Sequence, residues 1–260
     1  MKKGINFHQT FPANPAYIGR ILSISDGTQR SVRDISSLTG IPQGESSGKV
    51  DPHLTYAIFM GLLHEDGCTL TELGKTVLEE DCACGEELTQ WIMHIHLCSI
   101  SGADMWHYAF RDVFPRNHGI VTRGYFSSQM QSKYRTKVNF SPVLSCYTNE
   151  MTAINYLTAS SEKIAINPQN VQPEYLFVYA YGLMLEWEQI YPNKPEITSI
   201  ELNALACAEA FGLTEDQWFS VLEQMTSRGL IRINRQLSPF TVIKLTETTK
   251  LIPLLYSLLV

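Results

Sequence analysis

The succession of helix-start signals in the first part of the chain constrains the fold more than any other feature. A side chain that accepts hydrogen bonds from the free N–H groups of a first turn favours a helix start. Proline is tolerated in that turn because its missing N–H had no partner there. Apolar residues at helical spacing follow each signal. The signals are Asn14-Pro15, Ser31 with Asp34, and Asp51-Pro52. They predict helices near 15–25, 31–39 and 51–63.

A hairpin is predicted after the third of these helices. Asp66-Gly67 is a dipeptide typical of tight hairpin turns, and Thr69-Leu70 can form a short strand. A further helix follows, with Leu73, Val77 and Leu78 on its inner face. The order helix, helix, loop, helix, hairpin is that of a winged helix-turn-helix.

The C-terminal part of the chain repeats this order. One helix is predicted from about 198 to 211, and the next begins at a capping box formed by Thr214 and Gln217. Two β-rich runs, LIRIN and TVIKL, then flank a loop. This pattern predicts a second winged helix, with Arg232 and Arg235 on or near its wing.

The middle of the chain predicts mostly helices. Residues 86–114 indicate two helices broken near Ser101-Gly102, KIAI at 163–166 indicates a strand, and 173–191 indicates a strongly apolar helix. We therefore predict a mainly α protein with small β wings. Its expected regions are an N-terminal winged-helix-like domain (1–81), a helical middle region (82–195) and a C-terminal winged-helix-like domain (196–260).

Composition favours a cytoplasmic protein without a membrane segment. The sequence contains no run of 18 apolar residues, and its beginning lacks the apolar core of a signal peptide. Six cysteines in a chain of 260 residues are better explained as reduced thiols than as a disulfide scaffold. Cys82 and Cys84 raise the alternative of zinc, but their C-x-C spacing differs from the usual C-x₂-C.

The charge is unevenly distributed along the chain. The net charge is −6, yet no acid occurs from Val113 to Asn149. Cations that follow a backbone and rings on which bases stack suit a single-stranded nucleic-acid groove. The alternative is a solvated basic loop with buried aromatic residues. The cations of this segment are Arg116, Arg123, Lys133, Arg135 and Lys137, and its aromatic residues include Tyr125 and Tyr134.

The loop before the third helix is a candidate phosphate site. Ser46, Ser47 and Lys49 precede a helix N-terminus, where free N–H groups, hydroxyls and an ammonium can meet an anion. His53 follows one turn later and completes the predicted DNA-binding set of this region. The alternative is a polar loop that only caps the helix.

Asp104 and His107 are the candidate catalytic residues. They are neighbours at i and i+3 on a predicted helix. A carboxylate with an imidazole can bind Mg²⁺, with Asp104 as the ligand, or activate water for phosphodiester hydrolysis. Ordinary polarity of a helix surface is the competing interpretation.

Four segments resemble the conserved-domain family to which SspB proteins of DNA phosphorothioation systems belong. The resemblance implies a DNA-nicking component that acts with a divalent metal, Mg²⁺ being the expected ion. It also implies partners: a cysteine desulfurase, an ATPase and a sulfurtransferase-like protein, with homodimerisation left open. The segments are FHQTFPANPAYIGRIL, GIPQGESSGKVDPHLTYAIFMGLL, LTELGKTVLEED and GLIRINRQLSPFTVIKL.

Two other classes of function stay open. Winged helices mostly bind DNA without cutting it, so a non-enzymatic regulator or scaffold is the first alternative. A protein–protein adaptor that binds no DNA is the second, with the apolar C-terminal run LIPLLYSLLV as its interface.

Overall fold

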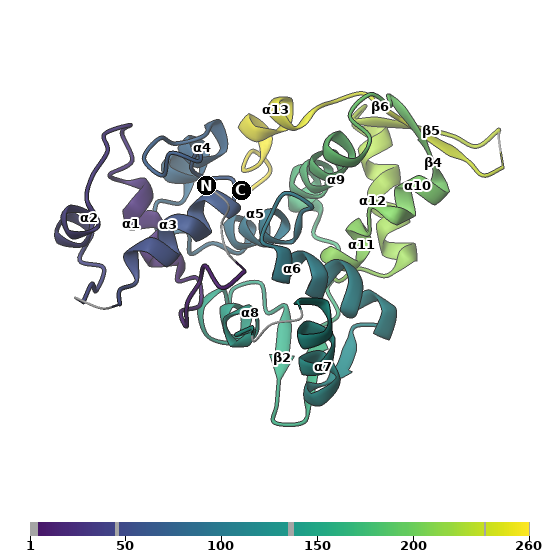
Figure 1. The fold of residues 1–260 in the computed structure, drawn as a ribbon. Helices are drawn as coiled ribbons and strands as arrows, with labels where there is room; N and C mark the ends of the chain where they lie inside the picture. The colour runs from purple at the N-terminus through teal and green to yellow at the C-terminus, as the bar shows by residue number, and fades with distance from the viewer. Residues whose placement is uncertain (1–4, 45–46, 135–137, 237, 260) are drawn as a thin grey trace.

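The protein was analysed as a computed structural model that describes residues 5–44, 47–134, 138–236 and 238–259. About 52% of the chain is helical, and two three-stranded antiparallel sheets accompany the helices (Figure 1), which confirms a mainly α fold with small β elements. The α-helices are α1 (Pro15–Leu22), α2 (Val32–Thr39), α3 (Val50–Phe59), α4 (Glu72–Glu80), α5 (Glu87–Cys98), α6 (Asp104–Tyr108), α7 (Arg123–Tyr134), α8 (Ser141–Ser145), α9 (Leu176–Ile190), α10 (Ser199–Ala204), α11 (Cys207–Ala210), α12 (Glu215–Ser227) and α13 (Thr248–Leu251). The π turns are η1 (Ala109–Val113) and η3 (Cys146–Glu150), and the 3₁₀ turns are η2 (Pro115–Asn117), η4 (Pro173–Tyr175) and η5 (Ile252–Leu254). The strands are β1 (Ile120–Thr122), β2 (Leu157–Ala159), β3 (Lys163–Ile166), β4 (Glu196–Thr198), β5 (Ile231–Asn234) and β6 (Thr241–Lys244).

Two of the three predicted helix starts of the N-terminal region are confirmed with their caps, whereas α3 begins at Val50 after Lys49 and has no side-chain cap, so Asp51 is not the predicted cap. The Asn14 side chain accepts from the N–H of Tyr17, and Ser31 and Asp34 form a complete capping box on α2. Gly40 ends α2 in the left-handed conformation, which a residue without a Cβ adopts at little cost. Helices α1 and α3 end three and four residues earlier than predicted, at Leu22 and Phe59.

Three short extended segments lie side by side next to these helices. Asp26, which follows α1, pairs with Thr69, and Leu63, which follows α3, pairs with Leu70. The Asp66 carboxylate accepts from the N–H groups of Cys68 and Thr69 and closes the predicted turn. The N-terminal region therefore runs helix, extended segment, helix, helix and hairpin.

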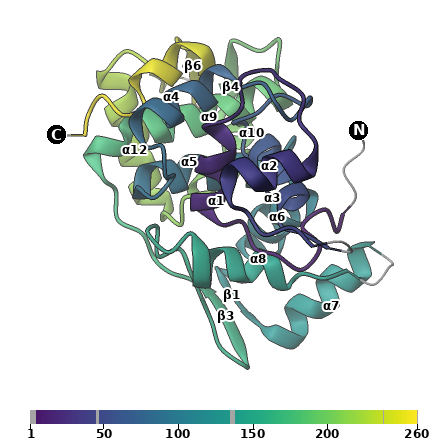
Figure 2. The ribbon, with the colours of Figure 1, turned by 90° about the vertical axis from the view of Figure 1, so that its left-hand side faces the viewer.

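The acid-free segment contains a helix that the sequence did not predict. Of α7, only Phe126 and Met130 are buried, so the helix lacks the regular apolar stripe on which such predictions depend. It lies beside β1, whose sheet has the order β1-β3-β2, and both extend below α1–α3 in Figure 2.

The C-terminal region has the element order α9, β4, α10, α11, α12, β5, β6. Its sheet has the order β4-β6-β5 with antiparallel pairs throughout. The helix predicted from 198 to 211 is wrong in one respect, since Ala206 adopts a left-handed φ of 50° and separates α10 from α11. The capping box of Thr214 and Gln217 on α12 is confirmed.

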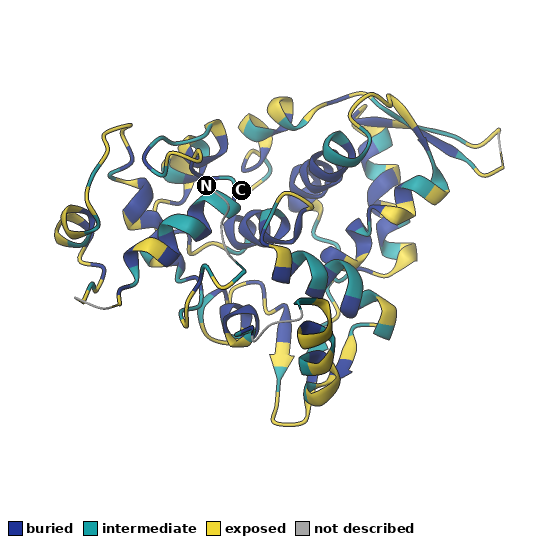
Figure 3. Cartoon of the chain, in the orientation of Figure 1, coloured by how far each residue is buried: buried dark blue, intermediate teal, exposed yellow. Residues whose placement is uncertain are grey.

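One continuous core connects these regions, with α5 and α9 near its centre (Figure 3). Helix α9 is buried over most of its length. Near the end of the chain Leu251, Leu255 and Tyr256 are also buried, and the Tyr256 hydroxyl lies 2.7 Å from that of Thr89 on α5. Within the described ranges, no helix combines the length and apolar character needed to cross a bilayer.

Candidate nucleic-acid interface

Lys49 lies on a small surface built of rings and cations at the start of α3. Its ammonium is 5.6 Å from the Phe11 ring centroid and 5.4 Å from that of Tyr17. The Arg20 guanidinium is 5.8 Å from the centroid of the same Tyr17 ring. Among the described residues no carboxylate forms an ion pair with either cation. Both positive charges therefore remain available to an anion, and we call this group of four residues the Lys49 surface.

The predicted loop residues around Lys49 differ in their placement. Ser47 is exposed beside the helix start, and Ser46 lies outside the described residues. His53 is 1% exposed, and both ring nitrogens are occupied. Nδ1–H donates to the Lys49 carbonyl at 2.6 Å, while Nε2 accepts from the N–H of Asn14 at 3.0 Å. A direct DNA contact by His53 is therefore contradicted, and the ring instead ties Lys49 to the start of α1.

Helix α7 carries two further cations, one near each of its ends. Arg123 and Lys133 have no ion pair with a described carboxylate, and Lys133 lies 5.0 Å from the Tyr108 ring. Arg116, in contrast, pairs with Asp112 at 2.6 Å, which offsets its charge. Arg135 lies outside the part of the chain that the structure describes.

The aromatic residues of this segment serve mainly as core. Phe114 and Phe126 are buried and stack with centroids 5.5 Å apart, and Tyr147 is buried as well. Tyr134 is half-buried, and only Tyr125, at 42% exposure, offers a ring to solvent. The alternative interpretation, a solvated basic loop with buried aromatic residues, therefore fits most of the rings, but residues 123–134 form helix α7 and not a loop.

The two arginines of the C-terminal hairpin also differ. Arg232 on β5 is exposed. Arg235 pairs with Glu223 at 2.7 Å and lies 5.2 Å from the Phe219 ring, so its charge is already engaged by α12.

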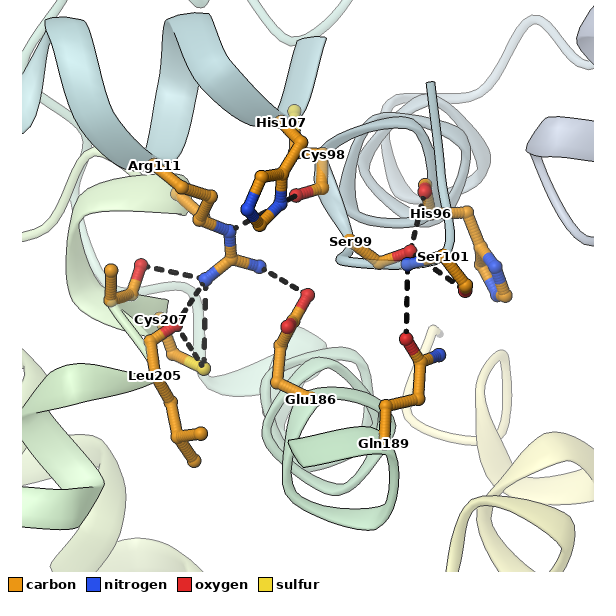
Figure 4. Close-up of polar contacts among 12 residues, drawn as sticks. His96, Cys98, Ser99, Ser101, His107, Arg111, Glu186, Gln189, Leu205 and Cys207 are labelled. Atoms are coloured by element: carbon orange, nitrogen blue, oxygen red, sulfur yellow. Dashed lines mark hydrogen bonds and ion pairs between the residues drawn. The ribbon is translucent and has the colours of Figure 1, made fainter. Parts of the chain in front are cut away.

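The two predicted catalytic residues lie on α6 and have different surroundings. Asp104 is exposed at the start of α6, where it lines a cavity of about 490 Å³ together with His64 and Glu65. His107 is half-buried, and its Nδ1–H donates to the Cys98 carbonyl at 3.0 Å (Figure 4). Among the described hydrogen bonds, none joins His107 to Asp104.

The described side chains around Asp104 do not by themselves form a magnesium site. Within the described ranges, no three His, Cys, Asp or Glu side chains converge closely enough to hold a metal. Mg²⁺ prefers octahedral oxygen ligands and often takes several of them from water and substrate phosphates. A single carboxylate such as Asp104 is therefore not a metal site on its own.

The sequence missed a buried polar centre around Arg111 (Figure 4). Its guanidinium pairs with Glu186 of α9 at 3.1 Å and donates to the carbonyls of Leu205 and Ala206 at 2.6 and 2.8 Å. Burial raises the pKa of the Glu186 carboxyl, and the adjacent Arg111 opposes that rise. Arg111 is followed directly by Asp112, and Glu186 lies two residues before Glu188, so neither residue stands out in the sequence as a lone charge in an apolar run.

Comparison with solved structures shows what this arrangement resembles. A crystal structure of SspB superposes with a TM-score of 0.71 at 13% identity, over 98% of this chain and 86% of that chain. A crystal structure of magnesium ion-bound SspB gives a TM-score of 0.65 at 12% identity over the same shares. No protein-family profile matches the sequence, and no curated protein matches it. The chain therefore has an SspB-like fold.

Proposed function

We propose that this protein is a DNA-binding component of a DNA phosphorothioation system and that it contacts the DNA backbone through the Lys49 surface. The observation that carries the proposal is a pair of cations, Lys49 and Arg20, held by aromatic rings beside a helix N-terminus without an acidic partner among the described residues. Cations and helix N-termini are the usual phosphate contacts of DNA-binding proteins. The SspB-like fold and the resemblance of the sequence supply the biological context.

We further propose that the two ends of the chain are winged-helix domains, covering 1–81 and 196–260, joined by the middle region 82–195. The order α9, β4, α10–α11, α12, β5, β6 supports this for the C-terminal region when α10 and α11 are counted as one broken helix, although α9 lies before residue 196. The antiparallel sheet order β4-β6-β5 supports it as well. The bridges at Asp26, Leu63 and Leu70 give the N-terminal region the same order in shorter form. On this proposal α3 would be the helix nearest the DNA groove.

The proposed activity is Mg²⁺-dependent nicking of one DNA strand, with the cysteine desulfurase, ATPase and sulfurtransferase-like proteins of such systems as partners. Its support is the resemblance of the sequence together with a magnesium ion-bound neighbour of the same fold. Because the described side chains form no metal site, no chemical step is assigned to them. Asp104 remains the carboxylate whose replacement is the first to test.

Incubation with supercoiled plasmid tests binding and nicking together. With Mg²⁺, a nickase converts the plasmid to the open-circular form, and Asp104→Asn should lower that rate while retardation of the plasmid persists. Retardation without relaxation would leave a non-enzymatic regulator or scaffold. If the plasmid is neither retarded nor relaxed at low salt, a protein–protein adaptor remains as the function, and the proposed DNA binding is overturned.

A further inference from the structure

The helical half of the C-terminal region carries only negative charge. Residues 199–227, which span α10, α11 and α12, contain five acids and no lysine or arginine. Glu201 pairs with Lys194 and Glu223 pairs with Arg235. Glu209, Glu215 and Asp216 are exposed and have no ion pair with any described cation. These helices lie on the opposite side of the molecule from α1–α3 (Figure 1).

Two adjoining cavities open on this acidic half. One, of about 320 Å³, lies between α10, α11 and α12 and is lined by Trp218, Phe219 and Leu222. The other, of about 400 Å³, continues toward β1 and β3 and is lined by Phe114 and Ile166. Ala208, Glu209 and Glu215 line both cavities, so the two form one groove with carboxylates at its middle. We call it the α11–α12 groove.

The unpaired carboxylates at the middle of the groove disfavour a nucleic acid as its occupant. Lysine and arginine bind DNA by neutralising its phosphates, which releases counterions into solution, whereas unpaired carboxylates repel the phosphates. An extended protein segment with cationic and apolar side chains in alternation matches both features, because its cations would meet Glu209 and Glu215 while its apolar side chains enter the cavities.

We propose that the α11–α12 groove binds an extended basic segment of a protein partner, in which lysine or arginine alternates with apolar residues. The groove lies on a different surface from Lys49, so the proposal does not depend on the proposed DNA binding. The partner would be held by charge complementarity at Glu209 and Glu215 and by apolar contact with Phe219 and its neighbours.

A labelled dodecapeptide of alternating arginine and leucine tests the proposal by fluorescence anisotropy with the full chain. The double variant Glu209→Gln/Glu215→Gln should weaken binding about tenfold, since each lost exposed charge pair changes an affinity by a few-fold. Phe219→Ala should also weaken it, although the charge is unchanged. The matched control is Glu79→Gln/Glu80→Gln, which removes two exposed acids from α4, outside the groove.

Three outcomes would overturn the proposal. Equal weakening in both double variants would mean that the peptide senses only net charge. Equal binding of a peptide with glutamate in place of arginine would exclude charge complementarity. Full affinity in Phe219→Ala would exclude insertion into the apolar part of the groove. Urea midpoints equal to that of the parent verify that each variant is folded.

Discussion

At the residue scale, Lys49 offers the sharpest test of DNA binding. Lys49→Ala should weaken binding by a similar factor for all duplex sequences, because a phosphate contact carries no sequence information. It should also reduce the slope of log affinity against log salt by about 1, since one fewer counterion is released. Fluorescence anisotropy of a labelled duplex at several salt concentrations measures both quantities.

Lys75→Ala is the matched control for this experiment. Lys75 is an exposed lysine of the N-terminal region, whereas Lys49 is half-buried, and Lys75 pairs with Glu72 at 2.6 Å. Its removal changes the net charge by the same amount and should leave the slope nearly unchanged. If the two variants behave alike, the Lys49 surface has no specific role and the loop returns to its capping interpretation.

Also at the residue scale, the buried side chain of His94 makes the stability of the protein depend on pH. Its Nε2–H donates to the Ala210 carbonyl at 2.9 Å, so in the neutral ring Nδ1 accepts from the Tyr147 hydroxyl at 2.6 Å. Burial lowers the pKa of His94 from 6.5 to about 3, and it lowers the pKa of His8 and of His53 to about 4. Below pH 6.5 the unfolded chain therefore binds more protons than the folded one.

The free energy of unfolding should accordingly fall as pH drops from 6.5 toward 4, by about 1.4 kcal/mol per pH unit for each histidine once it is fully protonated in the unfolded state. His94→Gln should lower stability at pH 7 and reduce this pH slope by about one proton. Urea unfolding at pH 7, 6 and 5 measures the slope. An unchanged slope in the variant would mean that His94 titrates equally in both states.

The sequence predicted some residues of the candidate site and missed the reasons for their placement. Lys49 was identified from its position before a helix, but its rings come from Phe11 and Tyr17, far away in the sequence. His53 was predicted to reach DNA, and burial against Asn14 prevents it. Such contacts between distant segments follow from packing, which local spacing does not report.

At the element scale, the Arg111–Glu186 pair joins η1, α9 and the α10–α11 junction. Breaking a buried pair leaves an uncompensated charge, so Arg111→Ala should lower the free energy of unfolding by about 3–5 kcal/mol. Arg116→Ala is the control, because its pair with Asp112 is largely exposed and should contribute at most about 1 kcal/mol. Urea unfolding followed by circular dichroism compares them.

The double replacement Arg111→Met/Glu186→Met separates charge from packing. Apolar residues of similar volume can replace a buried pair at little cost, so the double variant should recover much of the lost stability. If it unfolds as easily as Arg111→Ala, the guanidinium is required for its bonds to the Leu205 and Ala206 carbonyls rather than for its charge.

Element starts were predictable because caps are local, whereas several elements depended on tertiary context. The capping boxes on α2 and α12 place both helix starts correctly. Helix α7 has two buried residues and no apolar stripe, and β4 has three residues that become a strand by pairing with β6. Weak local patterns of this kind are decided by neighbours that the sequence alone does not place.

At the scale of the whole molecule, the three predicted regions share one core. The last part of the chain contributes directly, because Leu251 and Leu255 are fully buried and η5 packs against α4 of the N-terminal region. The hydroxyl contact between Tyr256 and Thr89 adds a polar link to α5. The terminal run that the sequence left open as an adaptor interface thus places Leu251, Leu255 and Tyr256 in the core, whereas Leu254 and Leu259 are exposed.

Leu255→Ala should therefore destabilise the entire molecule and not only its C-terminal end. Truncation of a fully buried leucine lowers the free energy of unfolding by about 2–5 kcal/mol. Leu254→Ala is the matched control. The Leu254 side chain is 37% exposed, so its truncation should lower the free energy of unfolding much less. Urea unfolding can be followed by circular dichroism and by the fluorescence of the four tryptophans, Trp91, Trp106, Trp187 and Trp218, which lie in α5, α6, α9 and α12. With one cooperative core, the transitions seen by both probes should shift together. A shift confined to one probe would show that the C-terminal region unfolds on its own. A variant no less stable than Leu254→Ala would show that the end of the chain is dispensable to the core.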